Sequence, residues 1–236
     1  MGCCCVKSYT QERTTKYDEI KQSLKTGDIV LFSGMSPMSN IVKCSSSSQW
    51  SHIGMVVRLG NSEDRLKIRD PDGLYLWHSN SDSIDCLPDV ISGVPKTGCQ
   101  LSTLGKAIRC YTGTCVLRQL SDPFYDDQGL VKEFIFKEAH KNYEKNTCEL
   151  FLSVYDGPCG RNKKNTEYYF CSELVAQTYM VMGLLKDQEY GIPSNEYLPR
   201  DFSEDSVLEL LSNYTLLEEF MLLPPSYKKA HSCDGF

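Results

Sequence analysis

The chain has 236 residues and a formal net charge of −6, with 24% of its residues charged. This length suits one large domain, which should bury roughly 70 to 75% of the surface that its unfolded form exposes. The acidic balance argues against a nucleic-acid groove or a broad basic surface for anionic lipids, because both need clustered lysine and arginine. We therefore expect no nucleic-acid partner.

Twelve cysteines could suggest a disulfide framework, yet no secretory signal is evident before them, since the first thirteen residues lack an apolar stretch. A reducing compartment is therefore expected. No two cysteines have C-x-x-C spacing, so we expect neither a metal site nor another cofactor. No apolar run approaches the ~20 residues of a membrane-spanning helix, and none is predicted.

The N-terminal residues predict a double lipid anchor. Gly2 can be myristoylated once the initiator is removed, and Cys3, Cys4 and Cys5 can be palmitoylated. One acyl chain binds only marginally, so two signals would hold the protein on the cytoplasmic face of a membrane. The myristoylation pattern favours Ser or Thr at the sixth residue, where this chain has Val6, and a disordered tail with reactive thiols is the alternative.

The hydrophobic pattern first predicts a helix over residues 17–24, then buried strands over 29–32 and 52–58 with a short helix over 37–43 between them. A strand over 74–79 follows, with Leu74, Leu76 and His78 on one face. Beyond it we expect a short helix over 101–109, a strand over 114–120 and the longest helix over 128–145.

Near the C-terminus, a polar loop leads to a helix that begins at Cys171, whose three- and four-residue spacing places this cysteine on the buried stripe. Ser203 is expected to cap a further helix, and residues 216–222 to end the fold. Together these elements predict an α+β protein, with a small antiparallel sheet or barrel packed against helices. Its parts are an anchor and polar tether over residues 1–16, one domain over 17–223 and a flexible tail over 224–236.

Two residues carry the chemical interest: His52 opens an apolar strand, and Cys171 opens an apolar helix. Free N–H groups and the positive dipole end at a helix N-terminus favour thiolate, the attacking species, over thiol. A nearby imidazole would complete the activation, which predicts a thiol nucleophile with a histidine base. The alternatives are a small buried hydrophobe for Cys171 and a core histidine bonded to a loop carbonyl for His52. Asp28 and Glu173 are expected to be structural.

Four segments, 26–32 (TGDIVLF), 50–56 (WSHIGMV), 76–79 (LWHS) and 169–175 (YFCSELV), resemble in this order the circularly permuted papain-like enzymes of the NlpC superfamily, particularly the YiiX-like branch. In ordinary papain-like enzymes the cysteine helix precedes the histidine strand, whereas in the permuted group the histidine comes first, as it does here. The resemblance covers about residues 27–203. It implies a permuted papain-like fold with the nucleophile at a helix N-terminus.

The resemblance also implies roles for single residues. Cys171 would be the nucleophile and His52 the general base. The third role falls to His78, where YiiX-like relatives commonly have a glutamate and the related lecithin retinol acyltransferase group has a histidine; alternatively, His78 only alternates with Trp77 across an edge strand. The backbone N–H of Cys171 would serve as oxyanion donor, with Tyr169 a weaker candidate.

The expected function is that of a membrane-tethered cysteine hydrolase or acyltransferase that acts on an amide or ester bond through an acyl-Cys171 intermediate. Anchorage favours a lipid, a lipidated amine or a membrane protein as substrate, because tethering raises the local concentration at that surface. One alternative is a catalytically inert, membrane-anchored lipid- or protein-binding module of the same fold. Another is a peptidase or amidase for peptidoglycan-like amide bonds.

Overall fold

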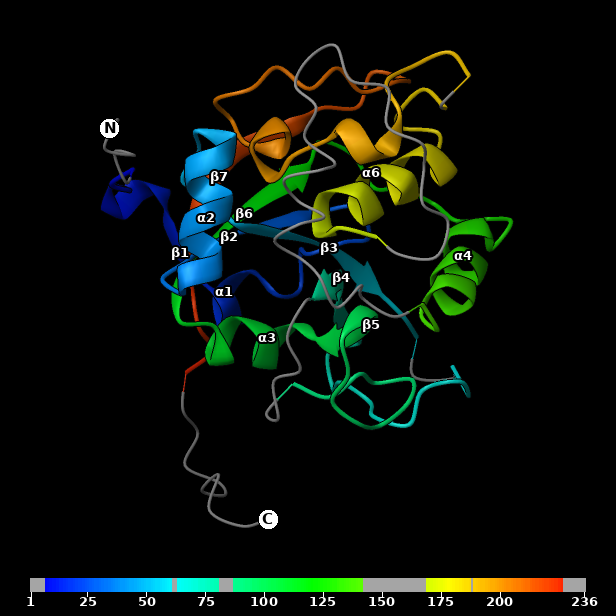
Figure 1. Cartoon of the computed structure of the whole chain (residues 1–236). Helices are drawn as coiled ribbons and strands as arrows, with labels where there is room; N and C mark the ends of the chain where they lie inside the picture. Colours follow the sequence, from blue (N-terminus) through cyan, green and yellow to red (C-terminus); the bar gives the residue numbers. More distant parts are fainter. Residues whose placement is uncertain (1–6, 61–62, 81–86, 142–168, 188, 227–236) are drawn as a thin grey trace.

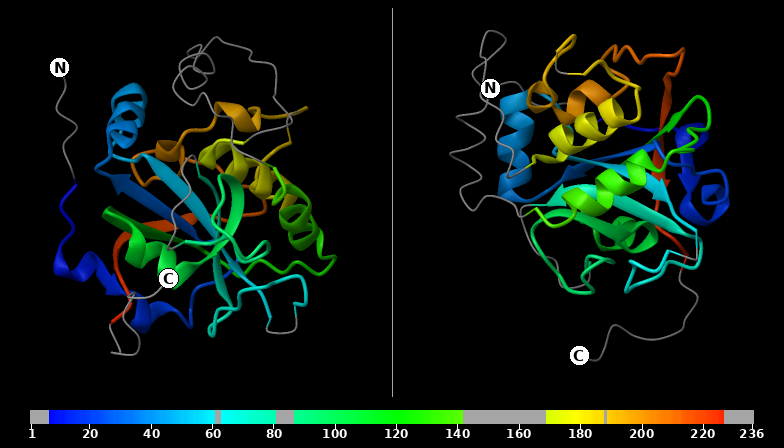
Figure 2. Two further views of the ribbon diagram at one scale, coloured as in Figure 1. Left: turned by 60° about the horizontal axis from the view of Figure 1, so that its bottom comes forward. Right: turned by 90° about the vertical axis from the view of Figure 1, so that its right-hand side faces the viewer.

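A computed structural model describes residues 7–60, 63–80, 87–141, 169–187 and 189–226. Its centre is a seven-stranded sheet in the order β1-β7-β6-β2-β3-β4-β5, with helices packed around it (Figure 1; Figure 2). Neighbouring strands are antiparallel except β1, which runs parallel to β7. The protein is therefore an α+β protein, as predicted.

The elements have these bounds. The strands are β1 (Thr14–Lys16), β2 (Ile29–Gly34), β3 (His52–Arg58), β4 (Leu74–Asn80), β5 (Gly98–Thr103), β6 (Gly113–Leu120) and β7 (Leu216–Leu223). The helices are α1 (Tyr17–Ile20), α2 (Pro37–Ser46), α3 (Leu104–Cys110), α4 (Leu130–Glu138) and α6 (Cys171–Val181), with short 3-10 turns η1 (Gln11–Arg13), η2 (Ser194–Glu196) and η3 (Pro199–Phe202).

The central strands are buried on both faces, which explains why they read as almost continuous apolar runs. Ile53 and Met55 of β3 pack into the same core cluster as residues of α6 and α4. Val56 of β3 and Leu76 of β4 face the other way, into a second cluster shared with α1 and α3. The two-residue alternation of a strand therefore fills two cores from one sheet.

Hydrogen bonds fix α6 against the sheet. The indole Nε1 of Trp77 donates to Thr178 Oγ1 at 3.1 Å, and the hydroxyl of Tyr179 donates to the carbonyl of Gly27 at 2.5 Å. At the start of the helix, the Glu173 carboxylate accepts from the N–H of Phe170 at 3.3 Å, a capping contact. Each such bond is worth about 1 kcal/mol, and the contact of Glu173 with Phe170 fixes where the helix begins.

Some predicted elements differ from the structure. Residues 101–103 belong to β5 and not to a helix, because Gln100 and Ser102 alternate with apolar neighbours across a buried strand, and α3 begins only at Leu104. α1 ends at Ile20, whereas the predicted helix ends at residue 24. α4 ends at Glu138, whereas the predicted helix ends at residue 145; residues 142–145 of that prediction lie outside the described part of the chain. The prediction of a helix after Ser203 is also wrong, since the residues that follow form turns and irregular structure.

Residues 7–16, predicted to form a polar tether, instead lie in the folded body. The Glu219 carboxylate, fully buried on β7, accepts from the Tyr9 hydroxyl at 2.7 Å and pairs with Lys7 at 3.3 Å. Glu204 accepts two bonds from Arg13 at 2.9 Å and a further one from Lys7 at 3.0 Å. We call these five side chains the N-terminal clamp; with β1 they hold the segment that follows the predicted anchor.

Asp28 is structural, as predicted: its buried carboxylate accepts from the N–H groups of Leu120 and Lys25, both at 2.9 Å. At the other end of the chain, Ser226 donates its N–H to Asp18 at 2.7 Å, and residues 227–236 of the predicted tail lie outside the described part. Among the described residues, no helix has the length and apolar character needed to cross a membrane.

Candidate active site

Two histidines from neighbouring strands contact each other at the centre of the sheet. Nε2 of His52, at the start of β3, lies 3.1 Å from Nδ1 of His78 on β4. Their rings meet edge to face, with centroids 5.3 Å apart. His78 is almost completely buried, whereas His52 is partly exposed. The structure therefore brings together the two histidines singled out by the sequence, and leaves Nδ1 of His52 as the ring nitrogen not used in this contact.

The hydrogen bonds continue from His78 to the next strand. Nε2 of His78 lies 3.2 Å from the hydroxyl oxygen of Ser102 on β5. Gln100 stands directly opposite His78 in the β4–β5 ladder, and its buried amide has no hydrogen-bond partner among the described residues. If Nδ1 of His52 is to accept a proton, the proton of its ring must be on Nε2, which then donates to Nδ1 of His78. His78 must in turn carry its proton on Nε2 and donate it to the Ser102 hydroxyl. One set of tautomers thus satisfies the whole chain.

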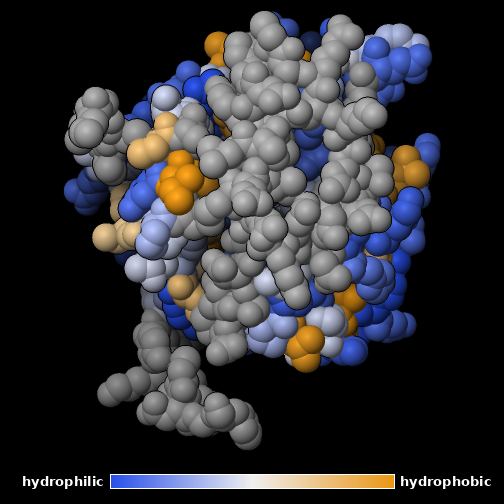
Figure 3. Space-filling model, in the orientation of Figure 1, coloured by the Kyte–Doolittle hydropathy of each residue, from blue (hydrophilic) through white to orange (hydrophobic). Residues whose placement is uncertain are grey.

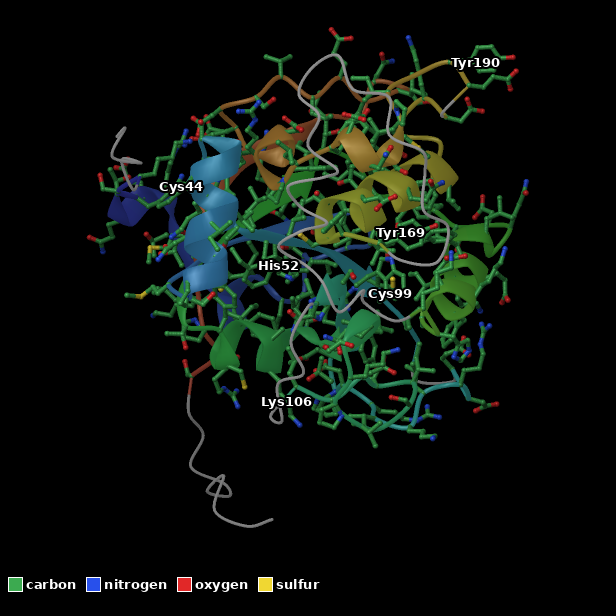
Figure 4. The ribbon with its side chains drawn as sticks, in the orientation of Figure 1. Cys44, His52, Cys99, Lys106, Tyr169 and Tyr190 are labelled. Atoms are coloured by element: carbon green, nitrogen blue, oxygen red, sulfur yellow. The ribbon has the colours of Figure 1, made fainter. Side chains whose placement is uncertain are left out.

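Cys171 lies where β3 and β4 separate. The paired part of β3 with β4 begins at Met55, and toward the start of β3 the N–H of Ile53 hydrogen-bonds the sulfur of Cys171. The Ser79 hydroxyl of β4 donates to the carbonyl of Tyr169 at 2.6 Å, which holds the residues just before α6 at this opening. Figure 4 shows His52 beside the N-terminal end of α6. The thiol is therefore next in space to the residue that follows His52.

The protonation states at rest differ from the expected thiolate. Burial raises the pKa of the Cys171 thiol to about 11, although the N–H groups of Ile53, Ser172 and Cys171 itself act in the opposite direction. Burial also lowers the pKa of His52 to about 4 and that of His78 well below its ordinary value. Desolvation therefore outweighs the helix N-terminus, and the resting site holds a neutral thiol and two neutral imidazoles.

A polar group that the sequence did not indicate borders the thiol. The hydroxyl of Tyr111, which follows α3, is hydrogen-bonded by the side chains of Ser51 and Ser39, and burial raises its pKa to about 12. Charge on Cys171 would raise the Tyr111 pKa further, so the two groups influence each other electrostatically. The Tyr111 ring packs on Phe32 at 4.7 Å between centroids. No spacing or motif connects residue 111 to the histidine strands, so only the fold reveals it.

The other predicted site residues lie elsewhere. The Tyr169 hydroxyl hydrogen-bonds Glu138 of α4, and Lys141 lies 4.7 Å from the centre of its ring, so this side chain is oriented toward α4 and not toward the thiol. Glu173 serves the start of α6, as expected. The proposed lipidation sites Gly2, Cys3, Cys4 and Cys5 lie outside the described residues. Within the described ranges no three metal-ligating side chains gather.

The fold and the site together define an α+β protein with a cysteine at a helix N-terminus near a pair of histidines in contact with each other. The sequence matches no known protein family and no curated protein. One structural neighbour is the crystal structure of metalloprotein yiiX from Escherichia coli O157:H7, with a TM-score of 0.42 and 16% sequence identity. The match covers 66% of this chain and 64% of that one. The roles considered below rest on this chain's own residues.

Proposed function

We propose that this protein is a membrane-anchored cysteine hydrolase or acyltransferase with a permuted papain-like fold. The observation that carries the proposal is the hydrogen-bonded series His52, His78 and Ser102 on three adjacent strands, with the thiol of Cys171 bonded to the N–H of Ile53, the residue after His52. Their order, thiol then imidazole then orienting partner, is the order that nucleophilic catalysis requires.

In the proposed reaction, the sulfur of Cys171 attacks the carbonyl carbon of an amide or ester while Nδ1 of His52 takes the thiol proton. The tetrahedral intermediate collapses, its bond to the leaving amine or alcohol breaks, and the imidazolium gives its proton to that group. Water or a bound acceptor then attacks acyl-Cys171, with His52 again the base, and the thiol is restored. His78 holds His52 in the required tautomer through its hydrogen bond to Ser102.

The pKa values bear on how the first step proceeds. The gap between a pKa of about 11 for Cys171 and one of about 4 for His52 corresponds to a cost on the order of 10 kcal/mol for moving the proton from the thiol to the imidazole when the two groups do not interact. Attraction between the resulting unit charges returns only about 4 kcal/mol at 4 Å and an effective dielectric constant near 20. A preformed thiolate–imidazolium pair is therefore disfavoured, and proton transfer accompanies attack on the substrate.

The anchorage part of the proposal rests on the N-terminal sequence. Gly2 and three adjacent cysteines supply the two acyl signals that stable membrane attachment needs. A tethered thiol enzyme meets membrane-borne acyl donors at high local concentration, so the proposed substrates are a lipid, a lipidated amine or a membrane protein. The cytoplasmic face of a membrane is the proposed location.

A second candidate function is a catalytically inert, membrane-anchored binding module. The raised pKa of the Cys171 thiol favours it, because a buried, protonated cysteine behaves as a small hydrophobe. The histidine pair argues the other way, since a binding module gains nothing from one buried and one half-buried imidazole, which are costly to desolvate.

Acyl transfer from p-nitrophenyl esters and acyl thioesters, followed by intact mass and peptide mapping, tests the proposal. We expect one acyl group on Cys171, its loss in Cys171→Ala, and acylation slowed at least about a hundredfold in His52→Ala. Cys44→Ala, which removes an exposed thiol on α2, is the matched control and should leave the adduct in place. Acylation that is lost in Cys44→Ala, or that is as fast in His52→Ala as in the wild type, would instead support the inert binding module.

A further inference from the structure

α2 carries an exposed stripe without charge. Pro37, Asn40, Ile41 and Cys44 are all exposed and recur at three- and four-residue spacing, so they share one face of the helix. Met35, just before the helix, is 73% exposed, and Ile41 is 42% exposed. In Figure 3 apolar side chains lie among polar ones at the position that α2 has in Figure 1. Single exposed apolar residues are common, so the stripe needs a second observation before it indicates a partner.

The second observation is where the N-terminal segment is held. The N–H of Lys7 donates to the side chain of Gln49, three residues after α2, at 2.9 Å. The N-terminal clamp fixes Lys7 at that point through Glu204 and Glu219. The five Cα–Cα steps from Gly2 to Lys7 span at most about 18 Å, and the ten residues of α2 are about 15 Å long. The attachment points on residues 2–5 can therefore reach the stripe.

α2 is also fixed on the sheet, so its outer face has one orientation. Lys43 donates to the carbonyl of Gly34 at 2.7 Å, and Arg200 donates to the carbonyl of Ser46 at 2.8 Å. Ser39, on the inner side, hydrogen-bonds Tyr111, which also bonds Ser51 beside His52. Only the thickness of α2, roughly 10 Å, therefore separates its outer face from the residues around the candidate site.

We propose that this outer face of α2, together with Met35, is the surface that contacts the lipid bilayer. The inference rests on the anchorage in the proposed function and goes beyond it by assigning the face and hence the orientation. The occupant is the hydrocarbon and headgroup boundary of a membrane, because the stripe is uncharged, exposes Met35 and Ile41, and lies within reach of the acyl groups. The candidate site at Cys171 then lies close to the bilayer, so that an acyl-lipid substrate need move only a short distance to reach the thiol.

Co-sedimentation of the full chain with phosphatidylcholine vesicles tests the proposal, after intact mass has recorded which acyl groups the purified chain carries. The test variant is Met35→Asp with Ile41→Asp. The control is Tyr190→Asp, which changes a side chain that is 75% exposed and lies far from α2 in Figure 4. We expect the α2 variant to bind on the order of tenfold more weakly and the control to bind like the wild type. Salt from about 0.1 M to about 1 M should leave the wild-type binding unchanged.

The outcomes separate the two proposals. Equal partition of the wild type and the α2 variant, whether both bind or neither binds, overturns the docking face. An equal loss of vesicle binding in the Tyr190→Asp control would show that any added surface charge weakens binding, and would overturn the docking face as well. An intact mass without acyl groups defeats the lipid anchor alone, and the acylation of Cys171 by esters reports the thiol chemistry independently of either result.

Discussion

The alkylation rate of Cys171 follows from its burial. With a thiol pKa of about 11, the thiolate fraction at pH 7.4 is roughly 1 in 4,000, against about 1 in 14 for a free cysteine of pKa ~8.5. The thiolate of the weaker acid is more nucleophilic, by roughly 13-fold for a Brønsted coefficient of about 0.45. Together these effects predict iodoacetamide alkylation about 20-fold slower than that of free cysteine, before any effect of access.

The assay is a time course of iodoacetamide labelling of the folded chain from about pH 6 to about pH 10, with the Cys171 peptide quantified by mass spectrometry against free cysteine. Because the thiolate form grows as the pH rises toward the thiol pKa, the rate should increase about tenfold per pH unit over this range without a plateau. His52→Ala should leave this profile unchanged, because no ion pair exists at rest.

A contrary profile would be equally informative. If Cys171 labels faster than free cysteine at neutral pH, and its rate levels off near pH 7 or below, a thiolate–imidazolium pair exists in the resting site. The argument that desolvation outweighs the helix N-terminus would then be refuted. Loss of that fast phase in His52→Ala would identify the imidazolium as the cause.

Three further predictions concern stability and site geometry. His52 and His78 have lowered pKa values in the folded state, so below about pH 6.5 the unfolded chain binds more protons than the folded one. The free energy of unfolding, measured with urea, should therefore fall as the pH falls, by up to about 2 kcal/mol per histidine at pH 5. A His52→Gln and His78→Gln double variant that kept the full slope would contradict this. Gly54→Ala would place a Cβ 2.6 Å from a leucine of β4 and 3.2 Å from His78 Cβ, so it should cost about 1–3 kcal/mol and slow acylation, and wild-type kinetics would count against it. Glu219→Gln should cost about 1–3 kcal/mol in the same unfolding measurement, whereas the exposed Glu218→Gln should cost almost nothing; equal costs would rule out the N-terminal clamp as the cause.

Much of the fold could be predicted where burial alone decides the pattern. The bounds of β3 agree with the apolar run of residues 52–58, and α6 begins at Cys171 as its spacing indicates. β5 was missed because its buried side chains alternate between apolar and polar over only a few residues, so it lacks the continuous apolar run of the other central strands. The burial of Gln100 and Ser102 is explained by contact with His78, a tertiary relation that no local propensity encodes.

Part of the candidate site could likewise be predicted from the sequence. The pairing of His52 with His78 follows from two adjacent strands, and the structure agrees. Ser102 could not be found, because the segment that carries it was assigned to a helix. The protonated state of Cys171 was also missed, since the favourable effect of a helix N-terminus can be seen in the sequence, whereas the cost of desolvation depends on packing that only the fold defines.

The parallel pairing of β1 with β7 also has a consequence in time. Lys16 and Leu223 are partners separated by about 200 residues, and β7 lies between β1 and the rest of the sheet. At roughly 5–20 residues per second, a ribosome needs about 10 to 40 s to make the strand that holds β1 after β1 itself has been made. During synthesis, the first sixteen residues therefore have no sheet to join, and an acyltransferase acting on the nascent chain would meet them unpaired. The proposed anchor would then be attached before the sheet is complete.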